Sequence, residues 1–131
     1  MTITYVRGPK DLSNGEYDRF YAPRIEAAWK RGDSFVVGDC QGTDYMAQRQ
    51  LAELNAGARQ SLKENSAGAL VIVFHCGKSP KWSVNRRGKC RHETRGGHWF
   101  EFTKKFAMWS AADIIIDWHR CTGEGHCDLH L

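Results

Sequence analysis

The sequence contains no apolar run long enough to cross a lipid bilayer. Its longest apolar runs are ALVIVF (69–74) and ADIII (112–116), whereas a membrane-spanning helix needs about 20 apolar residues. The first residues, MTITYVRGPK, also lack the apolar core of a secretory signal peptide. We therefore expect a cytoplasmic protein without a membrane partner.

The cysteines include no C-x-x-C pair, which is the spacing of many redox and zinc sites. There are five of them, an odd number, so they cannot all pair within one chain. Without a secretory signal, reduced thiols are the expected state. The five are Cys40, Cys76, Cys90, Cys121 and Cys127.

Internal repeats, low-complexity tracts and linkers are also missing from the sequence. Apolar residues make up 41% of the chain and charged residues 26%, which are ordinary values for a globular protein. A chain of 131 residues is long enough to bury a core of its own. We expect a single domain over residues 1–131.

Four short apolar segments, TITYV (2–6), SFVVG (34–38), ALVIVF (69–74) and ADIIID (112–117), predict strands. The last two are continuous apolar runs rich in β-branched residues. Such runs are typical of strands that are buried on both faces, as in a parallel sheet covered by helices.

Between these segments lie three stretches with helical spacing of apolar residues, at 16–31, 44–56 and 100–111. Pro23 should kink or restart the first helix. In the last helix, Trp109 is expected to lie in the core or in an interface. The alternation of strands and helices predicts a three-layer, Rossmann-like α/β domain with a mainly parallel sheet.

The net charge of +4 is unevenly distributed. Residues 77–106 hold nine Lys or Arg against two Glu, a balance of +7, so the remaining residues sum to −3. A basic block suggests an anionic partner, although a solvated basic loop would look the same. We interpret 75–99 as a long loop, which could be a lid over a nucleotide or an oligomer-forming arm.

The turn GDCQGTD (38–44) follows the second strand, so it should lie at the carboxyl edge of the sheet, beside the loop RGPK (7–10). Ligands of parallel sheets bind at that edge. Gly38 and Gly42 permit close backbone approach, and the following helix N-terminus, capped by Thr43, favours an anion. Carboxylates repel phosphate, so the two aspartates of the turn suit ribose hydroxyls, a base edge or helix capping better. A tight β–α turn without a ligand remains the alternative.

Three motifs, GPK after the first strand, the strand–GDCQGTD–helix unit and the late KKFAMWSAADIII, resemble the SLOG superfamily of small Rossmann-like domains, related to the LOG nucleotide hydrolases. The resemblance implies a pocket for a nucleotide or a nucleotide-derived molecule, such as an ADP-ribose-like or cyclic nucleotide signal, and a homo-oligomer. Lysines stand where the family has two arginines, and an aspartate replaces a glycine of the turn. The positions that match by motif are Gly8, Lys10, Gly42, Asp44, Lys104, Met108 and Asp113.

The hydrolases of this superfamily place a glutamate shortly after a GT turn, but here the position three residues beyond Thr43 is Met46. We therefore expect a sensor or sequestering domain that binds its ligand without turnover and needs no cofactor. The alternative is an N-glycosidic hydrolase of a nucleoside monophosphate, with Asp39 or Asp44 as its acid. A further alternative is a nucleic-acid-binding module that uses the basic block.

The basic loop adds Trp82 as a candidate for base stacking, with Arg86 and Arg87 as candidates for phosphate binding.

The tail contains four residues of a metal-binding type, His119, Cys121, His126 and Cys127. We expect no metal, because their spacing matches no standard zinc site. The expected ligand-binding residues are Gly8, Pro9, Lys10, Gly38, Asp39, Gln41, Gly42, Thr43, Asp44, Trp82, Arg86, Arg87 and Lys104.

Overall fold

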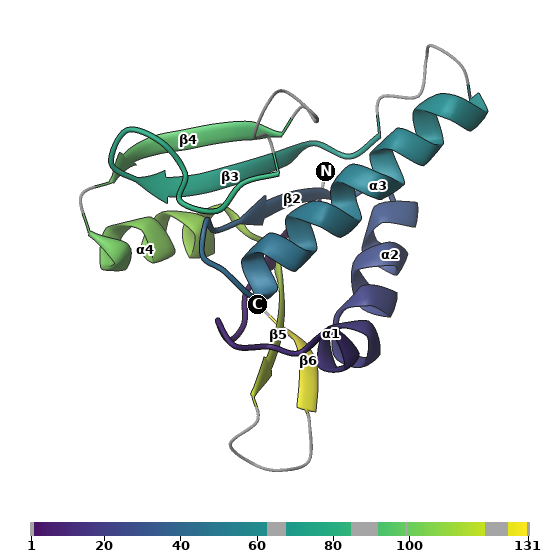
Figure 1. Ribbon diagram of the computed structural model, residues 1–131, viewed down its shortest axis with the longest axis horizontal. Coiled ribbons are helices and arrows are strands. Elements are labelled where there is room, and N and C mark those ends of the chain that lie inside the picture. The colour runs from purple at the N-terminus through teal and green to yellow at the C-terminus, as the bar shows by residue number, and fades with distance from the viewer. Residues whose placement is uncertain (1, 63–67, 85–91, 99, 120–125, 131) are drawn as a thin grey trace.

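The computed structural model of the protein describes residues 2–62, 68–84, 92–98, 100–119 and 126–130. They form one sheet with helices on both of its faces (Figure 1). The strand order is β4-β3-β2-β1-β5-β6. The strands are β1 (Ile3–Val6), β2 (Ser34–Val37), β3 (Val71–Cys76), β4 (Glu93–His98), β5 (Ile114–His119) and β6 (His126–His130).

The first five strands pair in parallel, and β6 adds an antiparallel edge next to β5. The expected α/β fold with a mainly parallel, Rossmann-like sheet is thus confirmed. All four predicted strands are present at their predicted places, because their apolar, β-branched runs suit a sheet that is covered on both faces.

The helices are α1 (Asn14–Phe20), α2 (Ala22–Lys30), α3 (Thr43–Leu62) and α4 (Glu101–Ala111). Pro23 marks the restart expected from the sequence, since α1 ends at Phe20 and α2 carries the proline in its first turn. Ser13 and Glu16 close the start of α1 as a reciprocal capping box. Within the described residues, no helix is both long and apolar enough to cross a membrane.

The core is divided between the two faces of the sheet. The larger cluster packs the sheet against α1, α2 and α3, and includes Tyr21, Ile25 and Leu51, all with no exposed surface. The smaller cluster lies under α4 and contains Tyr5, Met108 and neighbouring apolar side chains. In Figure 1, α3 crosses in front of the strands and α4 lies apart from the other helices.

The structure corrects the sequence analysis at two elements. Residues 93–98, expected to be loop, form β4, and the tail contains β6. On α4, Lys104 and Met108 face the sheet, while Phe106 and Trp109 are 60% and 52% exposed. Of the two places expected for Trp109, the core is thus excluded, and an interface stays a prediction.

Candidate functional site

The loops that follow β1, β2 and β3 meet at the carboxyl edge of the sheet, together with the first turn of α4. Strand β1 lies between β2 and β5, so the chain leaves β1 towards one side and returns to β5 on the other. Such a reversal of strand order opens a crevice at the carboxyl ends, where ligands of α/β sheets commonly bind. The candidate site is the carboxyl edge at this reversal, with the side chains around it.

The loop after β1 and the turn before α3 interlock through their backbones. Thr43, the first residue of α3 and fully buried, donates both its N–H and its hydroxyl to the carbonyl of Pro9, at 3.2 and 2.8 Å. Gly42 has a φ of +79°, and a Cβ there would collide with the carbonyls of Pro9 and Lys10. A Cβ at Gly8 would meet the Thr43 side chain and the Tyr21 hydroxyl. The structure thus brings Gly8, Pro9, Gly42 and Thr43 together, and the contacts it gives them hold the two loops in place.

Asp39 and Lys104 form a buried ion pair within this edge. The Lys104 ammonium lies 2.8 Å from Asp39 Oδ1 and 2.8 Å from Glu101 Oε2, and the side chains of Asp39 and Lys104 are each 1% exposed. The backbone N–H of Lys81 donates to the other Asp39 oxygen at 2.9 Å. Burial on its own raises the pKa of Asp39, but the hydrogen bonds from Lys104 and Lys81 outweigh it and lower that pKa overall.

The Lys104 ammonium is also held firmly in its charged form. Burial alone would lower the pKa of Lys104, but its hydrogen bonds to Asp39 and Glu101 raise it. Asp39 and Lys104, expected to bind ligand, therefore have each other as partners.

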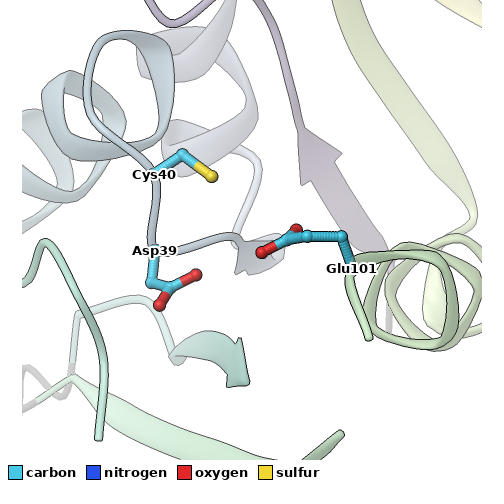
Figure 2. Close-up of side chains that lie close together, drawn as sticks. All are labelled: Asp39, Cys40 and Glu101. Carbon is cyan, nitrogen blue, oxygen red and sulfur yellow. The ribbon is translucent and has the colours of Figure 1, made fainter. Parts of the chain in front are cut away.

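Figure 2 shows Asp39, Cys40 and Glu101 pointing towards one another from the β2 loop and α4. One ligand-type atom from each lies within 4.8 Å of the other two. Carboxylate and thiol groups at this spacing are typical of metal sites, but the positive charge here is that of the Lys104 ammonium, which contacts both carboxylates. We interpret the cluster as an internal ion network.

Two thiols lie at this cluster, Cys40 in the loop after β2 and Cys76 at the end of β3. The Cys76 thiol lies 3.9 Å from Glu101 Oε1. The pKa of Cys40 is raised, first by burial and then by Asp44, and the pKa of Cys76 is raised by burial and then by Glu101. Neither thiol has the lowered pKa of a reactive cysteine.

Asp44, in the first turn of α3, is the carboxylate of the turn with spare hydrogen-bonding capacity. Its Oδ2 accepts from the Cys40 N–H at 3.2 Å, and no ion pair is formed by it among the described residues. A Cβ at Gly38 would touch this carboxylate, so the glycine makes room for it. Burial raises the pKa of Asp44 to about 6, against the lowering effects of the Cys40 hydrogen bond and of Lys104.

An arginine that the sequence analysis did not single out follows β1 directly, where β1 pairs with β5. Arg7 donates from Nε to Asp117 at 2.9 Å, and its guanidinium lies 5.9 Å from the Tyr5 ring centroid. Its side chain is 41% exposed, whereas that of Asp117 is 3% exposed. Among the described residues, the two terminal nitrogens of Arg7 have no hydrogen-bond partner.

The Tyr5 side chain connects Arg7 electrostatically to Asp44. The pKa of Tyr5 is raised to about 12, first by burial and then by the negative charge of Asp44, while Arg7 and Lys104 lower it. The hydroxyl therefore lies within electrostatic reach of both groups. Only the pairing of β1 with β5 brings Asp117 to Arg7, and this pairing has no local sequence signal.

The segment after β3 is fixed to α3 by Gln48. The buried Gln48 side chain donates to the carbonyls of Gly38 and Trp82 and accepts from the Val84 N–H, all at 3.0–3.1 Å. Trp82 is 44% exposed and packs edge-on against Tyr45, with 5.6 Å between ring centroids. Trp82 is therefore partly exposed at this edge, and its stacking role stays a prediction.

The remaining expected residues lie at the rim or outside the described residues. Lys10 and Gln41 are exposed at the rim. Arg86, Arg87 and Cys121 lie outside the described residues, and so do the side chains of the other tail candidates. The backbone register of β5 and β6 places His119 opposite His126.

Searches of protein-family models, characterised proteins and solved structures gave no significant match to this chain.

Proposed function

We propose that the protein binds a nucleotide or a nucleotide-derived small molecule at the carboxyl edge of β1, β2 and β5, as a sensor or sequestering domain. The observation that carries the proposal is the orientation of Arg7 by Asp117 and Tyr5 at the point where the strand order reverses. A guanidinium whose two terminal nitrogens have no partner within the described part of the chain suits a phosphate group, which it can bind in a bidentate manner. The motif resemblance to SLOG domains supports the same ligand class.

Asp44 supplies the second part of the proposed recognition. Its carboxylate keeps an oxygen for a ligand hydroxyl, and it lies within electrostatic reach of the same tyrosine as Arg7. A cation and a hydroxyl acceptor that both lie near one tyrosine suit a phosphate joined to a ribose. Trp82 is available for the base at the outer rim.

Calorimetric titration with ADP-ribose, AMP and a cyclic nucleotide tests this function. We expect at least one of them to bind, and Arg7→Gln to weaken that binding by roughly tenfold or more, because a charge-assisted phosphate contact is lost. Arg49→Gln, an exposed arginine on α3, is the matched control and should bind as the wild type does. Failure of all three ligands to bind, or equal loss in both variants, would refute the proposal.

Binding of two ligands to two protein variants, compared in a thermodynamic cycle, tests the role of Asp44. If its carboxylate accepts a ribose hydroxyl, the deoxyribose form of the ligand should bind the wild type more weakly. The affinities of the ribose and deoxyribose forms should then differ less for Asp44→Asn than for the wild type. Additive effects of the two changes would place the ribose elsewhere.

The pKa of Asp44 favours N-glycosidic hydrolysis as a second candidate. A carboxyl group with a pKa of about 6 retains part of its proton near neutral pH and can protonate a leaving base while water attacks the sugar carbon. Release of free base from a nucleoside monophosphate, falling above about pH 6 and lost in Asp44→Asn, would show this activity. Binding without base release is the expected result.

A further inference from the structure

Strand β4 forms one edge of the sheet, and no other strand of the described residues pairs with its outer side (Figure 1). An unpaired edge exposes backbone N–H and C=O groups that can pair with another strand. Proteins often protect such edges with lysine or proline, and β4 (ETRGGH) contains neither. Its register with β3 is regular over residues 93–95 and becomes irregular only beyond Arg95.

Glu93 and Arg95 lie on the same face of β4, because side chains of a strand alternate in direction. Both are exposed. Their register partners in β3 are Ile72 and Phe74, which belong to the core cluster under α4, and the Arg95 guanidinium lies 5.3 Å from the Phe74 ring centroid. Glu93 forms no ion pair among the described residues.

This sequence of charges complements itself when two copies of β4 pair in antiparallel fashion. A two-fold axis through Thr94 sets Glu93 of each copy directly opposite Arg95 of the other. Opposite charges in directly facing positions stabilise a strand pair, and like charges there destabilise it. Thr94 is exposed, and Gly96 has no side chain to obstruct a second strand beside it.

We propose that the β4 edge is a homodimer interface in which Glu93 and Arg95 form two symmetric cross-strand ion pairs. The two sheets then join into one continuous sheet, and the two-fold contact is closed, so it does not extend into a fibre. The occupant of the edge is a second copy of this chain, because the charge pattern of the strand is its own complement. The inference does not depend on the proposed ligand.

Sedimentation velocity over a wide range of protein concentration tests the interface. We expect the wild type to dimerise and the dimer to weaken with added salt. Glu93→Arg alone and Arg95→Glu alone should each weaken dimerisation by roughly tenfold or more, because both cross-strand pairs become repulsive. Glu53→Arg and Arg49→Glu, at exposed positions of α3, are matched controls and should dimerise as the wild type does.

Mixing the two variants distinguishes the proposed register from simple misfolding. The Glu93→Arg chain carries two positive side chains on this face of the strand, and the Arg95→Glu chain carries two negative ones. An equimolar mixture should therefore form a heterodimer, although neither variant dimerises well alone. The proposal is overturned by a wild type that stays monomeric, by a dimer that both single variants leave intact, by a mixture that fails to pair, or by assembly into open chains.

Discussion

Lys104 on α4 and Asp39 after β2 form an ion pair of 2.8 Å in which both side chains are 1% exposed. The two residues are 65 positions apart in sequence, and their contact joins α4 to the loop that precedes α3. Because the same ammonium also reaches Glu101, one cation pairs with a carboxylate of that loop and with one of α4. The carboxyl edge of the sheet is thus organised around a buried lysine.

Lys104→Met should destabilise the protein by about 3–5 kcal/mol, because it leaves the Asp39 carboxylate buried without its cation. Urea denaturation at neutral pH measures the loss. The double variant Lys104→Met/Asp39→Asn should be more stable than the single one, since the amide carries no charge and still accepts from the Lys81 N–H. A double variant that is no more stable would show that the pair has little energetic weight.

Asp44→Asn should stabilise the protein at neutral pH. The folded-state pKa of Asp44 is raised to about 6 from 3.8, so the folded state binds its proton more tightly than the unfolded state does. The wild type therefore loses stability as pH rises from about 4 to about 6, by roughly 1–3 kcal/mol. The asparagine removes this loss and can still accept from the Cys40 N–H.

The measurement is a pair of pH–stability profiles. The stability difference between Asp44→Asn and wild type should be largest above about pH 6 and disappear below about pH 4. A difference that is independent of pH would mean that the Asp44 pKa is not raised.

Gly42→Ala should cost roughly 2 kcal/mol or more, because an alanine disfavours the observed φ of +79° and its methyl group collides with the backbone of Pro9 and Lys10. Ligand binding should weaken as well, since the loops after β1 and β2 would separate. The control is Gly15→Ala in α1, where a Cβ meets no atom within 4 Å. That change should be neutral or stabilising in thermal unfolding, and equal losses at both positions would contradict the interlocking of the loops.

Gln48→Leu should release the segment after β3 from α3. It leaves the Val84 N–H and two carbonyls without the hydrogen bonds that Gln48 gives them, at a cost of about 1–3 kcal/mol. Hydrogen exchange of the Val84 amide should accelerate, and the fluorescence of Trp82 should change. Gln41→Leu, at an exposed position, is the matched control and should alter neither.

The sequence analysis located four strands and the loops that follow them, whereas the roles of the site residues stay predictions. The turn at 38–44 does lie at the carboxyl edge, next to the loop at 7–10, because the order of elements along the chain dictates it. Its two aspartates could not be told apart, since each is a carboxylate beside a glycine. Their different environments come from residues distant in sequence: Lys104 neutralises Asp39, and burial raises the pKa of Asp44.

Arg7 and β4 show the two kinds of feature that were missed. Arg7 becomes a candidate ligand residue only when β5 pairs with β1 and brings Asp117 beside it. Strand β4 contains two adjacent glycines and few apolar residues, so its composition opposes a strand assignment. It is a strand because β3 provides a backbone partner for residues 93–95 and again for His98.

The sequence by itself determined the class of fold, because buried strands and amphipathic helices leave a periodic apolar pattern that local steric and hydrophobic preferences create. It also determined which loops share one edge of the sheet. The tertiary structure alone decided which charges meet, which carboxyl group has a raised pKa and which strand ends the sheet. The physical reason is that hydrogen bonding, burial and charge pairing depend on distances between residues that the local pattern of the chain does not record.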